Sequence, residues 1–111
     1  RPERFFASEI IREKIFLNYK QEIPYSSEVI VREFKEKEDL IVILAEILVE
    51  RNSQKGIVIG EKGAMLKKIG IQARKDLETF FQKKVFLETR VKVDPDWRNN
   101  ELRLKQLGYK E

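Results

Sequence analysis

The 111-residue sequence contains no cysteine and no histidine. The absence of cysteine excludes disulfides, thiolate nucleophiles and cysteine-ligated zinc sites. The absence of histidine removes the usual general base at neutral pH, so an enzyme would have to work with carboxylates and lysines alone. We therefore expect a non-catalytic chain with no catalytic residues, no metal ligands and no cofactor of its own.

Long apolar runs are also absent. The most apolar run, residues 40–49, contains Glu46 and is too short to cross a bilayer. No signal-peptide pattern opens the chain, so we expect a cytoplasmic protein. Because the first residue is Arg1 rather than methionine, we also expect a fragment of a longer protein, cut at an interdomain linker.

Charged residues, by contrast, are abundant and unevenly distributed. They make up 38% of the chain, compared with about 25% in an average globular protein. Residues 51–75 contain seven basic side chains and one acidic one, whereas residues 28–50 contain three basic and seven acidic ones. A concentrated basic segment is typical of a surface that binds a polyanion, although a lysine-rich solvated helix would show the same pattern.

Apolar spacing predicts a helix near the start of the chain. Apolar side chains recur at four-residue intervals at Ile11, Ile15 and Tyr19 and indicate an amphipathic helix over residues 8–20. Ser8 is its expected N-cap, and Pro24 is expected to prevent its continuation. Residues 1–7 are then the end of an interdomain linker.

Three later segments predict β-strands. Residues 28–36 are rich in β-branched side chains, and residues 40–50 are almost continuously apolar. We expect a hairpin, with a helix as the alternative for the second segment. Residues 84–93 alternate between apolar and charged side chains, which predicts a half-buried strand with one wet face.

Residues 64–82 carry apolar side chains at steps of three and four, which predicts a long amphipathic helix. The whole order predicts an α+β fold in which helices pack on one face of a three-stranded sheet. The expected domain spans residues 8–96. A C-terminal turn or helix tail follows over residues 97–111, with leucines available to dock it.

A glycine-rich loop precedes the long helix. A P-loop would require glycine where Glu61 stands, and the spacing of Gly56, Gly60 and Gly63 lacks the GxG of a dinucleotide-binding loop. The remaining Gly-x-x-Gly pattern is weak alone, and a structural turn is the alternative. Its position before a helix favours phosphate binding, because glycine allows close approach and the first amides of the helix are unsatisfied.

The residues around this loop suggest how a nucleic-acid backbone would be held. Glu61 weakens the positive field inside the loop, so we expect phosphate contact to rest on Lys62 and on backbone amides. Ile57, Ile59 and Met65 are candidates for an apolar groove floor under the bases, with ordinary core packing as the alternative.

The order of elements resembles the type II KH domain, in which a GXXG loop before the long helix clamps about four nucleotides. More specifically, five segments resemble the C-terminal KH domain of the Era family of bacterial GTPases. These segments are ASEIIREKIF, EIPYSSEV, VERNSQKGIVIGEKG, KKIGIQARKDLE and VKVDPDWRNNELRLKQLGY. They cover almost the whole chain and are far more specific than the two glycines.

This resemblance implies an RNA-binding module. It would bind a single-stranded segment near the 3′ end of small-subunit ribosomal RNA during ribosome assembly. An N-terminal GTPase domain, which would hold GTP and Mg²⁺ in the parent protein, would gate that binding. The resemblance also leads us to expect a monomer and peripheral association with the inner membrane.

The family's RNA contacts are carried over to matching positions. The resemblance assigns the clamp to Ile59, Gly60, Glu61, Lys62 and Gly63. It assigns a basic rim to Lys67, Lys68 and Arg74. Further contacts are expected at Arg12 and Lys14, for which solvated charges on a helix surface are the alternative.

Two other functions remain open at this point. In the first, the chain is a protein-interaction or regulatory domain whose acidic residues 33–39 contact the GTPase domain or another assembly protein. In the second, Asp94 and Asp96 act as the paired carboxylates of a small hydrolase, although they lie on one short loop around Pro95 that implies no cleft.

Overall fold

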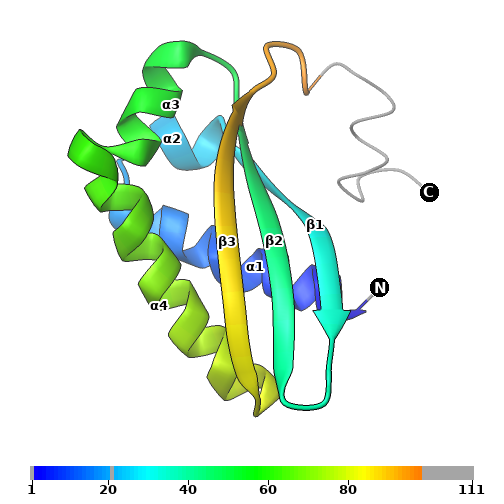
Figure 1. Ribbon diagram of the computed structural model, residues 1–111. Coiled ribbons are helices and arrows are strands. Elements are labelled where there is room, and N and C mark those ends of the chain that lie inside the picture. Colours follow the sequence, from blue (N-terminus) through cyan, green and yellow to red (C-terminus); the bar gives the residue numbers. More distant parts are fainter. Residues whose placement is uncertain (1, 21, 99–111) are drawn as a thin grey trace.

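The computed structural model describes residues 2–20 and 22–98, which form helices and a three-stranded sheet (Figure 1). In chain order the elements are α1 (Pro2–Asn18), α2 (Glu22–Tyr25), β1 (Glu28–Glu36), β2 (Leu40–Val49), α3 (Asn52–Ile59), a 3₁₀ turn (Glu61–Gly63), α4 (Ala64–Phe81) and β3 (Lys84–Val93). The predicted α+β class is therefore confirmed, as are all three strands and the long helix.

The sheet has the strand order β1-β2-β3. β1 and β2 pair antiparallel as the predicted hairpin, so the helical alternative for the second segment is wrong. β3 pairs parallel to β2, because the chain crosses over through α3 and α4 before it returns to the sheet. A register shift between Val31 and Glu33 interrupts the β1–β2 ladder.

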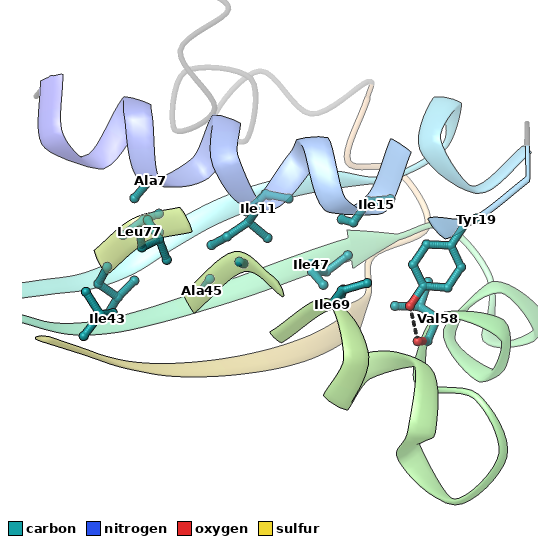
Figure 2. Close-up of a cluster of buried hydrophobic side chains, with 14 of the residues drawn as sticks. Ala7, Ile11, Ile15, Tyr19, Ile43, Ala45, Ile47, Val58, Ile69 and Leu77 are labelled. Atoms are coloured by element: carbon teal, nitrogen blue, oxygen red, sulfur yellow. Dashed lines mark hydrogen bonds between the residues drawn. The ribbon is translucent and has the colours of Figure 1, made fainter. Parts of the chain in front are cut away.

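The core lies between one face of the sheet and the helices α1 and α4. Side chains alternate along β2, and its odd-numbered residues point toward the helices. On this same face, Ile11 and Ile15 of α1 and Ile69 and Leu77 of α4 pack against them (Figure 2). This packing confirms the prediction that helices cover one face of the sheet.

The first helix begins earlier than the sequence pattern suggests. α1 starts at Pro2, a residue suited to the first turn because its ring fixes φ and it lacks an N–H that the helix would leave unpaired. Ser8 is therefore not an N-cap; its hydroxyl donates to the carbonyl of Phe5 at 2.8 Å inside the helix. Of the residues predicted to end a linker, residues 2–7 form the first turns of α1, and Ala7 is fully buried.

Two helices were not predicted. Pro24 lies in the first turn of α2, where proline is tolerated, rather than in an irregular segment. α3 lies directly before the glycine loop, in a segment whose spacing did not predict a helix. The buried Gln54 side chain stabilises the start of α3, since its Oε1 accepts the N–H groups of Glu50 and Arg51 at 2.9 Å and its amide donates to Ser26.

The end of the described chain crosses to the other side of the sheet. After β3, a turn places Trp97 against Ile30 and Leu48, which lie on the face opposite the helices. The predicted leucine contacts and most of the predicted tail over residues 97–111 lie outside the described residues. The domain boundaries themselves remain predictions.

Candidate nucleic-acid interface

Residues 60–63, the glycine loop, connect α3 to α4 and adopt conformations that favour glycine. The φ angle is 78° at Gly60, 55° at Lys62 and 77° at Gly63. A Cβ atom on Gly60 would lie 2.8 Å from Cβ and Cγ of Met65, so this position excludes other residues by conformation and by space. At Gly63 a Cβ would meet nothing within 4 Å, and the restriction there is conformational alone.

The loop presents the amino-terminal end of α4 and exposed charge. Gly63 is the N-cap of α4, and no side chain caps this helix end in the part of the chain that the structure describes. The first amides of α4 face the loop: that of Ala64 donates to the carbonyl of Glu61, and those that follow have no partner one turn back in the helix. The helix dipole adds positive potential around them. Glu61 and Lys62 are both exposed beside them. An anion that approaches the loop would meet these amides and Lys62.

An open groove of about 370 Å³ lies between α4 and β3 and begins at the loop. Its lining residues are Gly63, Leu66, Lys67, Gly70, Ile71, Arg74, Leu87 and Thr89. Those on α4 recur at three- and four-residue spacing and so share one side of the helix. The groove thus combines an apolar floor with two basic side chains, Lys67 and Arg74.

Arg74 enters the groove with its charge partly compensated. Its guanidinium lies 3.3 Å from the carboxylate of Glu78, one turn further along α4. The carboxylate of Glu78 also accepts the N–H of Val85 at 3.0 Å, and this bond, together with Arg74, holds the pKa of Glu78 below its usual value. The contact joins the last turn of α4 to the start of β3.

The structure separates the three residues predicted to form one groove floor. Because α3 is helical, Val58 points into the core while Ile57 is 54% exposed. Ile57 and Met65 line a second groove of about 490 Å³, on the side of α4 that faces α1. Ile59 is partly buried and lines neither groove.

The predicted basic residues are also divided among different surfaces. Lys67 lines the α4–β3 groove, whereas Lys68, about 100° further round the helix, is exposed and does not line it. Arg12 forms ion pairs with Glu9 and with the buried Glu28. Arg12 lies on α1 and does not line the α4–β3 groove.

Lys14 is buried rather than solvated. Its ammonium pairs with Asp76 of α4 and with Glu13. The hydrogen bond to Asp76 raises the pKa of Lys14. Lys14 thus joins α1 to α4, and contact with RNA at Lys14 or Arg12 stays a prediction.

Sequence reasoning missed the apolar part of the α4–β3 groove. The predicted helix and strand contain these residues, but the sequence did not predict them as site residues: Leu66, Gly70, Ile71, Leu87 and Thr89. One available signal was the seven-residue spacing of Gly63 and Gly70, which places both on one side of α4. A Cβ on Gly70 would meet nothing within 4 Å, so its backbone is open to a ligand.

Tyr19 stabilises the end of α3 that leads into the glycine loop. Its hydroxyl donates to the carbonyl of Val58, in the last turn of α3, at 2.6 Å (Figure 2). The last carbonyls of a helix have no partner within it, so this bond satisfies a buried acceptor two residues before Gly60. Burial raises the pKa of Tyr19 to about 12. Tyr19 therefore holds α3, and with it one end of the loop.

Among the described residues, no cluster of acidic, histidine or cysteine side chains could hold a metal ion. In the same part of the chain, no helix is both long enough and apolar enough to span a membrane.

Comparison with known proteins identifies relatives for almost the whole chain. A family model described as KH domain matches residues 22–98. The GTPase Era of Geobacter metallireducens is 57% identical over 110 residues, which cover 97% of this chain and 37% of the relative. The GTPase Era of Syntrophus aciditrophicus is 56% identical over 111 residues, which cover 98% of this chain and 36% of the relative.

Two solved structures superimpose on the whole chain with a TM-score of 0.92 at 40% identity, and it covers 38% of each. One is Aquifex aeolicus Era bound to GDP and AlF4⁻. The other is Era in complex with MgGDPNP and nucleotides 1506–1542 of 16S ribosomal RNA. The chain thus spans less than two fifths of the length of these relatives.

Proposed function

Because the chain belongs to the KH domain family, as a C-terminal KH domain of the Era type, we propose that it is the RNA-binding module of a longer GTPase. Its ligand is a single strand, held at the glycine loop and along the α4–β3 groove. A duplex does not fit this role, because its bases are stacked and paired and cannot reach the floor of the groove.

The observation that carries this proposal is that Gly63 belongs both to the glycine loop and to the α4–β3 groove. This residue is the N-cap of α4 and also lines the α4–β3 groove. A phosphate bound at the loop therefore has its neighbouring bases directly over the groove. The pattern of an anion site that opens into an apolar groove matches the way KH domains clamp about four nucleotides.

Each part of the interface has a proposed role. The amides of the loop and Lys62 bind phosphate, and Glu61 reduces the positive field there. Lys67 and Arg74 form the basic rim of the groove. The apolar floor is formed by Leu66, Gly70, Ile71 and Leu87, so bases rest on aliphatic side chains and on bare backbone.

The identity of the RNA follows from the relatives. A solved Era structure contains nucleotides 1506–1542 of 16S ribosomal RNA, which supports a segment near the 3′ end of small-subunit ribosomal RNA as the ligand. We propose that binding occurs in the cytoplasm during ribosome assembly. Peripheral membrane association and a monomeric state remain predictions.

GTP and Mg²⁺ are proposed for the remainder of the longer protein. The glycine spacing in this chain does not form a P-loop, and Era relatives carry the name GTPase and bind guanine nucleotides in solved structures. We propose that an N-terminal GTPase domain gates access of RNA to the loop.

The test is a double substitution at the loop, Glu61→Asp with Lys62→Asp. Aspartate tolerates the left-handed conformation of Lys62, so the loop should keep its shape and the circular dichroism spectrum should not change. Binding to a short single-stranded oligonucleotide from the 3′ end of 16S ribosomal RNA should be lost. Affinity of the wild type should also fall steeply as salt rises, since each neutralised phosphate releases counterions.

Lys37→Asp is the matched control, because it makes the same charge change in the β1–β2 turn, where Lys37 is exposed. It should leave RNA affinity within about twofold of the wild type. Unchanged affinity in the folded double variant, or an equal loss in the control, would overturn the assignment of the clamp.

A further inference from the structure

Five phenylalanine rings form a continuous ladder at the end of α4 that lies away from the glycine loop. The ring centroids are 5.4 Å apart for Phe5–Phe6, 5.2 Å for Phe6–Phe80, 5.0 Å for Phe80–Phe81 and 5.4 Å for Phe81–Phe34. The ladder runs from the first two turns of α1, across the last turn of α4, to β1. Three separate elements thus contribute to one aromatic surface.

The ladder is anchored at one end and exposed at the other. Phe34 and Phe81 are partly buried and pack against the hydrophobic core. Phe5, Phe6 and Phe80 are 57%, 42% and 50% exposed. Large apolar side chains that are exposed side by side mark interaction sites more often than isolated ones do. Aromatic rings suit such sites because they have few rotatable bonds and lose little entropy on binding.

The surroundings of the ladder do not suit RNA. α4 has 18 residues, so its two ends lie roughly 27 Å apart. Residues 33–39, which follow Phe34 along the hairpin, contain four acidic and two basic side chains. Lys83, just after α4, donates to Glu36 at 3.0 Å, and this contact ties the acidic hairpin to the same end of the molecule. Lys35, Lys37 and Lys83 offset most of this negative charge, so this end of the molecule lacks the excess of basic side chains found around the glycine loop. A protein surface with mixed charges around an apolar centre fits it better than a polyanion.

The relatives suggest which protein domain would dock on the aromatic ladder. The chain covers only 37% of the Era sequences that it matches, and it corresponds to their C-terminal KH domain. The remainder of such a protein precedes α1, whose first two turns carry Phe5 and Phe6. A domain tethered this close has a high effective concentration, so a modest apolar patch is enough to bind it.

We propose that the aromatic ladder is the docking surface for the GTPase domain that precedes this chain in the Era-type protein. The inference rests on the proposed function insofar as it takes the chain to be part of a longer GTPase. In the docked state the glycine loop and the α4–β3 groove at the other end stay open to RNA, so closure of the proposed gate requires the GTPase domain to leave this surface.

The experiment uses the full-length protein with Phe5→Ser and Phe80→Ser combined. Small-angle X-ray scattering should show a larger radius of gyration than in the wild type, because the two domains separate. The matched control is Leu17→Ser with Phe86→Ser, which removes side chains that are 71% and 55% exposed elsewhere. The control should keep the wild-type radius. Phe5→Ser alone provides a milder variant that is expected to fold if the double variant does not.

Three outcomes decide the matter. An increased radius in the ladder variant alone supports docking. An unchanged radius in the folded ladder variant overturns it. A concentration-dependent dimer of the wild type, seen by analytical ultracentrifugation and lost in the ladder variant, would also overturn it in favour of a second copy of the chain. Affinity for the short oligonucleotide is measured in parallel, so loss of the proposed RNA function would be seen separately.

Discussion

At its amino-terminal end, α4 meets bare backbone, exposed lysines and an open groove. At its carboxyl-terminal end the same helix meets a ladder of phenylalanines and, through Lys83, an acidic hairpin. Between the two ends, Ile69, Ala73 and Leu77 are buried against α1 and the sheet. The comparison shows how a small domain can present two different surfaces at a fixed separation, because the core holds the helix that joins them.

The two ends also differ in what makes them specific. The glycine loop depends on backbone conformations that only certain residues adopt, as at Gly60 and Gly63. The aromatic ladder depends on side chains that stand on ordinary helix and strand backbone. Substitutions that add a Cβ should therefore damage the first end, whereas substitutions that remove a ring should affect only what the second end binds.

The largest effect is expected for Gly60→Ala. The backbone conformation at Gly60 is almost confined to glycine and costs about 1–3 kcal/mol for other residues, and the new Cβ would also collide with Met65 at 2.8 Å. Urea unfolding should show a lower free energy of unfolding, and RNA affinity should fall with it.

Gly56→Ala is the matched control for that change, because Gly56 lies in helical α3 and a Cβ there meets nothing within 4 Å. It should stabilise the protein by up to about 1 kcal/mol. Equal unfolding midpoints for Gly60→Ala and Gly56→Ala would contradict the account of the loop.

At the aromatic end, Phe5→Ser should change stability by less than about 0.5 kcal/mol, since the ring is mostly exposed.

A smaller loss of stability is expected for Tyr19→Phe, which tests the hydrogen bond between Tyr19 and the end of α3. The substitution leaves the buried carbonyl of Val58 without its donor, at a cost of about 1–3 kcal/mol. Tyr25→Phe, at an exposed tyrosine, should have almost no effect. Affinity for the oligonucleotide should also decrease in Tyr19→Phe, because the end of α3 loses an anchor.

The contribution of Tyr19 should depend on pH in a defined direction. Burial raises its pKa from 10.0 to about 12 in the folded protein. The stabilisation is therefore fully present below pH 10 and is lost as pH rises toward 12, because the unfolded chain releases the proton first. The difference in stability between the wild type and Tyr19→Phe should narrow over this range. A constant difference from pH 8 to pH 12 would argue against the buried hydrogen bond.

A small gain in stability is expected for Gly70→Ala. Glycine inside a helix is less favourable than alanine by about 0.5–1 kcal/mol, and a Cβ here meets no neighbour. The variant should be slightly more stable. Gly70→Leu should also fold, but its side chain would fill the floor of the groove and weaken RNA binding several-fold. Oligonucleotide titrations that show full affinity for Gly70→Leu would remove the groove from the proposed interface.

The sequence predicts the elements that have a long, regular pattern. α4 and the three strands follow from helical and alternating spacing, and the glycine loop follows from the local requirement for residues without a Cβ. The short helix α3 could not be predicted in this way. Its start is stabilised by Gln54, which contacts Ser26, a residue 28 positions away in the chain.

The groove was only partly predictable for a similar reason. Lys67 and Arg74 follow from the charge pattern, but Leu87 joins them only because β3 is the edge strand beside α4. Lys14 shows the opposite case, since its pattern is that of a surface lysine while the fold buries it against Asp76. Contacts between elements that are distant in sequence decide both outcomes, and spacing along the chain does not encode them directly.

The most direct test of the central claim is an NMR titration of the ¹⁵N-labelled protein with a short single-stranded oligonucleotide from the 3′ end of 16S ribosomal RNA. The account predicts shifts of the amide signals of residues 60–63 and of Lys67, Gly70, Ile71 and Thr89, with the signals of Phe5, Phe6 and Phe80 unchanged. Shifts confined to the aromatic end, or none at either end at saturating RNA, would contradict it.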